Sequence, residues 1–221
     1  MAKRALVAGG TGRVGSAIAQ RLEADGWTVV AAGRADGDLS GAAGARELVE
    51  LAERRLGGLD LVVHAAGDGF ERRAVADVTE ADWDAALGVT VKGTFFLAQA
   101  AAPALRAANG LLVVVEDVAA YEAWPSYAPH SAAKAAQAAL TRVLARALAP
   151  DVRVCGVTPG TVAVGPDDAE RQAGRTLLGR VGKPGDVADA VAYLAGADFV
   201  TGTSLVVDGG RLAQSTRPPL P

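Results

Sequence analysis

Short apolar runs alternate along the chain with longer alanine-rich stretches in which apolar residues recur at helical spacing. Within the short runs nearly every position is apolar, which is typical of parallel strands covered by helices on both faces. This pattern predicts an α/β fold, a doubly wound parallel sheet in a single domain. We expect strands over 5–8, 28–32, 61–64, 111–115, 153–157 and 204–207, and helices over 14–24, 43–55, 80–108, 131–149 and 184–195.

The interval between the second and third expected strands is short. From Arg34 to Leu61 there is room for one helix and a stub, Asp38-Leu39-Ser40. A full doubly wound sheet would place a helix and a further strand here. We therefore expect that one helix is missing and that the third strand of such a sheet is reduced to this stub.

The first apolar run leads into a glycine-rich turn that opens the first expected helix. The spacing Gly10-x-Gly12-x-x-Gly15 in a strand–turn–helix setting is the dinucleotide fingerprint of Rossmann folds. Glycines allow a tight turn and a close approach to a pyrophosphate, and the helix N-terminus offers unpaired N–H groups to that anion. A plain glycine turn is the alternative interpretation.

The end of the second expected strand bears on the choice of dinucleotide. NAD-binding folds place an acidic residue there, which binds the ribose 2′-hydroxyl. This strand ends Ala31-Ala32-Gly33-Arg34, so a guanidinium group stands where a carboxylate would repel a 2′-phosphate. We therefore favour NADP(H); a solvated loop charge is the alternative role for Arg34.

Length and composition narrow the class of protein. The chain has 221 residues, a net charge of −3 and one cysteine, Cys155. We expect one domain over 1–212 and a disordered tail over 213–221. We expect no nucleic-acid partner, no internal disulfide and no membrane-spanning segment, and so a cytoplasmic protein without a metal site.

Five motifs, in order, resemble those of the short-chain dehydrogenase/reductase family over nearly the whole chain. They are the glycine turn 8–15, Asp38-Leu39, His64-Ala65-Ala66-Gly67, Thr158-Pro159-Gly160-Thr161-Val162 and the C-terminal strand region 201–210. The resemblance implies a cofactor site made of Gly9, Gly12, Arg13, Val14, Gly15, Arg34, Asp38, Leu39, Ala65, Ala66, Gly67, Lys134, Pro159, Gly160 and Val162.

The catalytic positions depart from the family pattern. Where the family has an Asn-Ser-Tyr-Lys tetrad, this chain has Thr90, Asp117, His130 and Lys134. Arg13 in the glycine turn and Asp117 resemble the pteridine-reductase branch of the family.

Carbonyl or imine reduction needs a proton donor as well as a hydride. Histidine, with an ordinary pKa near 6.5, can donate a proton near neutral pH, and a facing Asp117 would favour the imidazolium of His130, whereas Lys134 would disfavour it. Imidazole is shorter than phenol by roughly 2 Å, so Tyr127 is kept as a second candidate donor. His130 as a relic of lost catalysis, Asp117 as a loop cap and Thr90 as a purely intrahelical hydrogen-bonding residue are the alternatives.

These observations predict an NADPH-dependent reductase of a C=O or C=N bond in a small, pterin-like substrate. The alternatives are a 3-oxoacyl-carrier-protein reductase and an NADP(H)-binding scaffold or sensor without turnover. The alanine-rich helices over 94–108 and 131–149 favour close packing against a second copy, as a homodimer or homotetramer.

Overall fold

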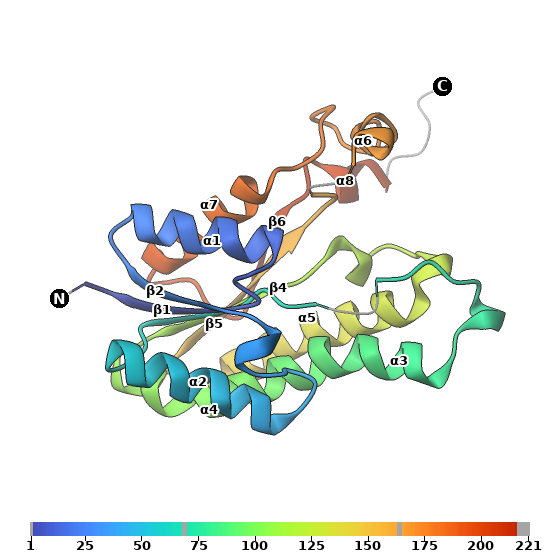
Figure 1. Ribbon diagram of the computed structural model, residues 1–221. Coiled ribbons are helices and arrows are strands. Elements are labelled where there is room, and N and C mark those ends of the chain that lie inside the picture. The colour runs from blue at the N-terminus through green and yellow to red at the C-terminus, as the bar shows by residue number, and fades with distance from the viewer. Residues whose placement is uncertain (1, 68–69, 163–164, 216–221) are drawn as a thin grey trace.

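The computed structural model describes residues 2–67, 70–162 and 165–215 and shows one parallel six-stranded sheet between two layers of helices (Figure 1). The strands lie in the order β2-β1-β3-β4-β5-β6. They are β1 (Arg4–Ala8), β2 (Thr28–Ala32), β3 (Leu61–His64), β4 (Leu111–Val115), β5 (Arg153–Pro159) and β6 (Ser204–Val207). The doubly wound α/β sheet predicted from the sequence is thereby confirmed.

The direction of winding reverses at β1. The chain passes from β1 to β2 on one side and later returns to β3 on the other. Ala8 is paired in register with Ala32 of β2 and with His64 of β3, so the three strands end level with one another. In sheets of this kind ligands bind beyond the carboxyl ends of the strands at such a reversal.

Helices cover both faces of the sheet. Helices α1 (Arg13–Ala24) and α7 (Pro184–Gly196) lie on one face, and α2 (Ala42–Leu56), α4 (Gly93–Ala107) and α5 (Ala128–Leu148) lie on the other (Figure 1). Alternate strand residues point to opposite layers: Leu6 and Ala8 join the buried cluster of α2, α4 and α5, whereas Ala5 and Val7 join that of α1 and α7. Both faces are buried, which explains the uninterrupted apolar runs.

The connection from β2 to β3 contains only one α-helix, α2, as expected. The stub Asp38-Leu39-Ser40, however, is a turn and not a strand. The backbone N–H of Ser40 donates to the Asp38 carboxylate over 2.9 Å, and that of Gly41 donates to the Asp38 carbonyl. An aspartate that bonds the backbone two residues ahead makes a turn, and here the turn leads directly into α2.

The helix expected over 80–108 is one continuous helix with a wider turn inside it. It consists of α3 (Glu80–Leu87), a π-helical turn at Gly88–Lys92 and α4. By length and composition alone this helix could cross a membrane, which corrects the expectation that no segment is long enough. More than half of its most apolar window is buried inside the protein, as in the core helix of a soluble domain.

Other boundaries differ by a few residues. Helix α5 starts at Ala128, three residues before the expected start, with Pro129 in its first turn, where proline is tolerated. The short helices α6 (Pro166–Ala173) and α8 (Arg211–Ser215) were not expected from the pattern. Residues 213–215 of the expected disordered tail lie in α8, and 216–221 lie outside the described residues.

Candidate active site

A cleft of about 230 Å³ opens beyond the carboxyl ends of β1, β2 and β3. Eight of the residues that line it are among the cofactor residues expected from the sequence: Gly9, Gly12, Arg34, Asp38, Leu39, Ala65, Ala66 and Gly67. Five lining residues were not expected: Thr11, Gly33, Gly37, Leu48 and Val89. Thr11 and Gly33 adjoin expected residues, so their place in the motifs was the available signal. Arg13, Val14, Gly15, Lys134, Pro159, Gly160 and Val162 do not line this cleft.

The glycines of the first turn have different structural roles. A side chain at Gly15 would place its Cβ 2.1 Å from the carbonyl oxygen of Gly9, and one at Gly9 would meet the backbone of Ala66 at 2.5 Å. Gly9 also has a φ of +84°, which favours glycine. These two glycines are therefore required by backbone packing, whether or not a ligand is bound.

Gly12 is the exception in this turn. A Cβ there would meet only the Gly9 carbonyl oxygen, at 3.4 Å, and its φ of −79° suits any residue. Gly12 is the N-cap of α1, no side chain caps that end of the helix, and its first turn contains no acidic residue. The open space and the uncapped N–H groups fit the pyrophosphate of a dinucleotide.

Arg34 and Asp38 lie on the outer wall of this cleft. Hydrogen bonds from Ser40, together with the charge of Arg34, hold the pKa of the Asp38 carboxyl below its usual range. The carboxylate of Asp36 accepts a hydrogen bond from the backbone N–H of Gly33 over 2.9 Å, so it is turned back on the loop. Arg34 therefore provides the positive charge in the part of the cleft that is formed by the loop after β2.

The expected catalytic residues converge on the first turns of α5. His130 is buried, and its Nε2 lies 3.5 Å from Oδ2 of Asp117 in the loop after β4. Oδ1 of Asp117 accepts from the backbone N–H of Ala119 over 2.8 Å, so this carboxylate caps the short helix Val118–Ala120 and also faces the imidazole. The capping role and the catalytic role weighed for Asp117 are therefore compatible.

Neither ring nitrogen of His130 has a hydrogen-bond partner among the described residues. A buried polar atom without a partner costs about 1–3 kcal/mol, so such atoms mark places where a ligand or water binds. Aromatic rings surround the imidazole: Phe70 meets it edge-on at 4.8 Å, and Trp124 lies parallel to it at 6.5 Å. Tyr127 stacks on Phe70 at 4.7 Å, which makes it part of this wall.

Lys134 lies one helical turn after His130 and is fully buried. Its Nζ donates to the carbonyl oxygen of Val115 over 3.0 Å and to Oε1 of Gln137 over 2.9 Å. Burial lowers the pKa of the Lys134 ammonium group, and the carboxylates of Asp117 and Glu116 oppose that shift.

Gln137 connects Lys134 to the π-helical turn. Its Nε2 donates to the Thr90 carbonyl over 3.3 Å and to the Thr94 hydroxyl over 2.9 Å. Thr90 thus takes part through its backbone, whereas its hydroxyl has no partner among the described residues. Sequence analysis missed Gln137, although its spacing of three residues from Lys134 places both on one helix face.

Glu116, immediately after β4, is a second buried residue that sequence analysis missed. Its carboxylate accepts from Thr141 over 2.7 Å and from Thr158 over 2.9 Å. It lies directly over Gly156 of β5, where a Cβ would come within 2.4 Å of Oε1. This carboxylate fixes α5 and β5 relative to the end of β4, behind Lys134.

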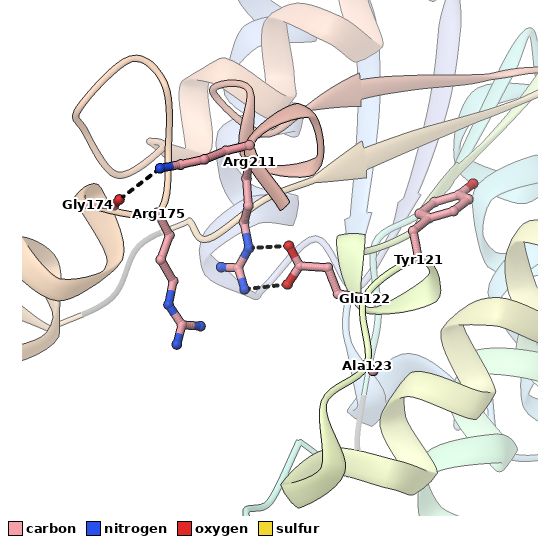
Figure 2. Close-up of a pocket in the computed structure, with 7 residues that line it drawn as sticks. Tyr121, Glu122, Ala123, Gly174, Arg175 and Arg211 are labelled. Atoms are coloured by element: carbon pink, nitrogen blue, oxygen red, sulfur yellow. Dashed lines mark hydrogen bonds and ion pairs between the residues drawn. The ribbon is translucent and has the colours of Figure 1, made fainter. Parts of the chain in front are cut away.

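A second pocket, of about 480 Å³, lies between the loop after β4 and the C-terminal segments (Figure 2). Across it Arg211, which is only 4% exposed, donates to both carboxylate oxygens of Glu122, over 2.9 and 2.7 Å. Burial would raise the pKa of the Glu122 carboxyl, but hydrogen bonds from Arg211 and Trp124 outweigh burial and hold the pKa below its usual range.

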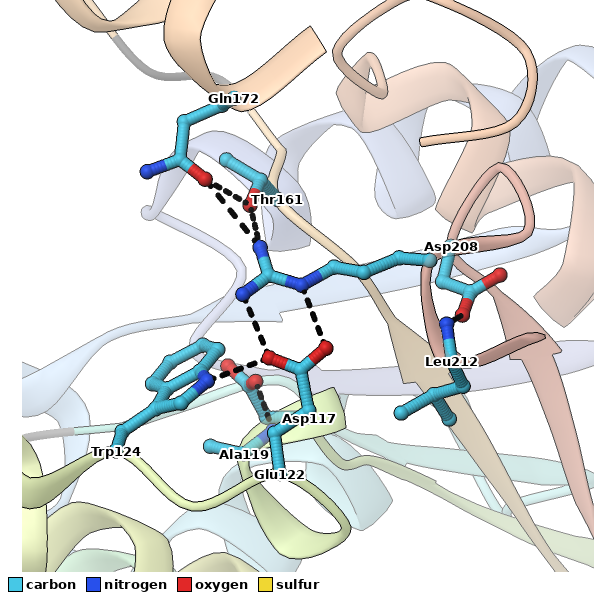
Figure 3. A network of polar contacts seen from close by, with 9 residues as sticks. Asp117, Ala119, Glu122, Trp124, Thr161, Gln172, Asp208 and Leu212 are labelled. Carbon is cyan, nitrogen blue, oxygen red and sulfur yellow. Dashed lines mark hydrogen bonds and ion pairs between the residues drawn. The ribbon is translucent and has the colours of Figure 1, made fainter. Parts of the chain in front are cut away.

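Arg211 also joins the segment after β5 to this network. Its Nη1 donates to the hydroxyl of Thr161 over 2.7 Å and to Oε1 of Gln172 in α6 over 3.3 Å (Figure 3). Its guanidinium group lies 5.1 Å from the ring of Trp124, the residue that flanks His130. The indole of Trp124 therefore connects this network to the imidazole of His130.

Comparison with known proteins shows which family has this fold. A family model described as enoyl-(acyl carrier protein) reductase matches residues 35–211. Dehydrogenase/reductase SDR family member 4 of Bos taurus is 32% identical over 244 aligned positions, which cover 96% of this chain and 88% of that protein.

Two solved structures extend the comparison to bound dinucleotides. A 7α-hydroxysteroid dehydrogenase, complexed with NADH and 7-oxo glycochenodeoxycholic acid, has a TM-score of 0.88 at 25% identity, over 94% of this chain and 93% of that one. A blue fluorescent protein from a metagenomic library, in complex with NADPH, has a TM-score of 0.84 at 30% identity, over 95% and 97% of the two chains. With the cleft, the sheet order and the relatives taken together, the chain belongs to the short-chain dehydrogenase/reductase family of oxidoreductases.

Proposed function

We propose that this oxidoreductase uses NADPH to reduce a C=O or C=N bond and that His130 supplies the proton. The observation that carries the proposal is the contact between Nε2 of His130 and Oδ2 of Asp117, at 3.5 Å. At this separation the carboxylate faces the imidazole, yet Nε2 has no hydrogen-bond partner among the described residues. The Asp117 side chain is a quarter exposed, which leaves an approach for a substrate oxygen or nitrogen.

The residues of the first cleft would hold the dinucleotide. Gly12 and the N-terminus of α1 would bind the pyrophosphate, and Asp38 and Leu39 would lie against the adenine side. When bound, the dinucleotide supplies the hydride. Lys134 keeps one N–H of its ammonium group beyond its two hydrogen bonds, and we assign that donor to the nicotinamide ribose.

We assign NADPH in preference to NADH on the charge beside the ribose. Arg34 lines the cleft just after β2, and a guanidinium group can bind a 2′-phosphate with paired N–H donors. The Asp36 carboxylate is occupied by the backbone of Gly33. With the Asp38 carboxylate of the same wall assigned to the adenine side, we take Arg34 as the group beside the ribose, which favours a 2′-phosphate over an uncharged 2′-hydroxyl.

Three classes of substrate contain a bond that this site could reduce. A ketone ligand in the hydroxysteroid dehydrogenase structure is consistent with a carbonyl substrate. A pterin-like ring is the second candidate, supported by Arg13 at the start of α1 and by Asp117, and a 3-oxoacyl thioester is the third, supported by the description of the matching family.

Substitution of His130 tests the proposal. If His130 is the acid, His130→Phe should lower NADPH oxidation at least 100-fold in a panel of dihydropterin, quinonoid dihydropterin and 3-oxoacyl thioester, and His130→Tyr should also lower it. Higher activity in His130→Tyr would identify a decayed enzyme. Tight NADPH binding without turnover of any substrate would favour a binding scaffold and contradict the proposal.

We also propose that the protein forms a homodimer or homotetramer through α4 and α5. Phe95 of α4 is 42% exposed and Val143 of α5 is 61% exposed, and packing against a second copy would remove this apolar surface from water. Light scattering during size-exclusion chromatography should give a mass above that of one chain, and Val143→Glu should reduce it. A monomer at micromolar concentration would contradict this proposal.

A further inference from the structure

The residues that line the pocket between Tyr121 and Arg175 carry a net positive charge. Its charged lining residues are Glu122, Arg175 and Arg211. Glu122 and Arg211 form a bidentate ion pair and so cancel each other. The remaining charge is that of Arg175.

Arg211 cannot serve a ligand in this pocket. It is 4% exposed, and its Nε, Nη1 and Nη2 atoms all donate to Glu122, Thr161 or Gln172. Glu122 is equally engaged, because its Oε2 also accepts from Nε1 of Trp124 over 2.6 Å. The pair is a structural wall of the pocket.

Arg175 is different. It lies in the turn after α6, is exposed, and its side chain extends into the open space that the Glu122–Arg211 pair faces (Figure 2). Its charge helps to lower the pKa of the Glu122 carboxyl, but among the described residues its guanidinium group makes no direct ion pair or hydrogen bond. On the neighbouring helix Asp168 is already paired with Arg171, so that acid is not a competing partner.

The indole of Trp124 links one wall of this pocket to His130. Trp124 donates a hydrogen bond to Glu122, and the guanidinium group of Arg211 lies over its ring. The same indole lies parallel to the imidazole of His130, at 6.5 Å between ring centroids. A ligand that extends from Arg175 past the Glu122–Arg211 pair would therefore meet the indole of Trp124, which flanks the imidazole.

We propose that the substrate carries a carboxylate that binds Arg175 while its reducible carbonyl lies against His130. Only the second half of this statement rests on the proposed function. A planar guanidinium group binds a carboxylate through two parallel hydrogen bonds, which gives orientation as well as affinity. The aromatic wall of Trp124 and Phe70 suits a flat, apolar body between the two groups.

The anion site can be tested by binding alone. Benzoate and benzamide have the same shape and differ in charge, and their affinities for the NADPH-loaded protein can be measured by calorimetry. We expect benzoate to bind at least tenfold more tightly, and Arg175→Gln to abolish that preference. Arg55→Gln removes the same charge from the last turn of α2, at the opposite edge of the sheet, and should leave the preference unchanged.

The reaction provides the second test. For 4-formylbenzoate, Arg175→Gln should raise KM at least tenfold and change kcat little, because the lost contact is present in both the ground state and the transition state. For 4-formylbenzamide the same variant should have no effect. Benzoate binding that depends on Arg175 without turnover of either aldehyde would support the anion site and contradict the proposed reductase function. Equal binding of benzoate and benzamide to the wild type, or equal losses in both arginine variants, would overturn the inference.

Discussion

Gly12→Ala separates the role of the glycine turn in binding from its role in folding. The added methyl group would enter the cleft, where the nearest protein atom, the Gly9 carbonyl oxygen, lies 3.4 Å away. The backbone at this position, with φ −79° and ψ 165°, is allowed for alanine. Alanine is a poorer N-cap than glycine, which lowers the free energy of unfolding. It also reduces the conformational freedom of the unfolded chain, which raises the free energy of unfolding by about 0.4–1 kcal/mol. These effects oppose each other, so we expect the free energy of unfolding to change by less than about 1 kcal/mol.

Dinucleotide binding should respond far more strongly. A methyl group in the space of a pyrophosphate forces a displacement that costs about 1–3 kcal/mol, by analogy with overpacking of a well-filled site. At 1.4 kcal/mol per factor of ten, this predicts a rise in the Kd for NADPH of roughly 5- to 150-fold. The assay is an equilibrium titration, with a thermal melt of each variant beside it.

Two matched variants complete this experiment. Gly185→Ala adds a methyl group in α7 where no atom beyond its own helix turn lies within 4 Å, so it should leave NADPH binding unchanged and raise the free energy of unfolding by at most about 1 kcal/mol. Gly15→Ala puts its Cβ 2.1 Å from the Gly9 carbonyl oxygen and should destabilise the fold itself. If Gly12→Ala bound NADPH as tightly as the wild type, the turn would not be the pyrophosphate site.

Three further predictions concern the interior. Burial lowers the pKa of His64 to about 4, from 6.5, so its contribution to stability is complete above pH 6.5 and is lost as the pH falls toward 4, by up to about 3 kcal/mol. The free energy of unfolding, measured with urea between pH 7 and pH 4.5, should fall more steeply with decreasing pH in the wild type than in His64→Gln. An equal pH dependence in the two proteins would contradict this prediction. Gly156→Ala should lower the free energy of unfolding by about 1–3 kcal/mol, because its Cβ would lie 2.4 Å from the buried Glu116 carboxylate. The control is Gly196→Ala, where the added Cβ meets open space. Equal melting temperatures for the two variants would contradict the prediction. Lys134→Ala should abolish reduction while the protein remains folded by circular dichroism, and full activity would exclude Lys134 from the site.

The sequence was most informative where local patterns decide structure. All six strands were predicted within two residues. The strands β1, β3, β4 and β5 are buried on both faces and therefore need apolar residues at successive positions, whereas the edge strands β2 and β6 are partly exposed. The glycine turn and the separation of one helical turn between His130 and Lys134 could also be read directly.

The parts that were missed depend on contacts between distant segments. The contact between Arg211 and Glu122 joins residues 89 positions apart, and the Gln137 link to Thr90 joins residues 47 apart. The apolar periodicity of the sequence does not distinguish the π-helical turn at Gly88–Lys92 from the α-helices on either side of it. The stub at Asp38 was misjudged because a side-chain bond to the backbone, which periodicity cannot detect, determines the turn.

The central claim is that the cleft beyond β1, β2 and β3 binds a dinucleotide whose 2′-phosphate meets Arg34. Its most direct test is a side-by-side titration of the wild type and Arg34→Ala with NADPH and NADH. We predict that the wild type binds NADPH at least tenfold more tightly than NADH and that the variant loses this preference. Equal affinities in the wild type would contradict the assignment of NADPH, and failure to bind either dinucleotide would contradict the site itself.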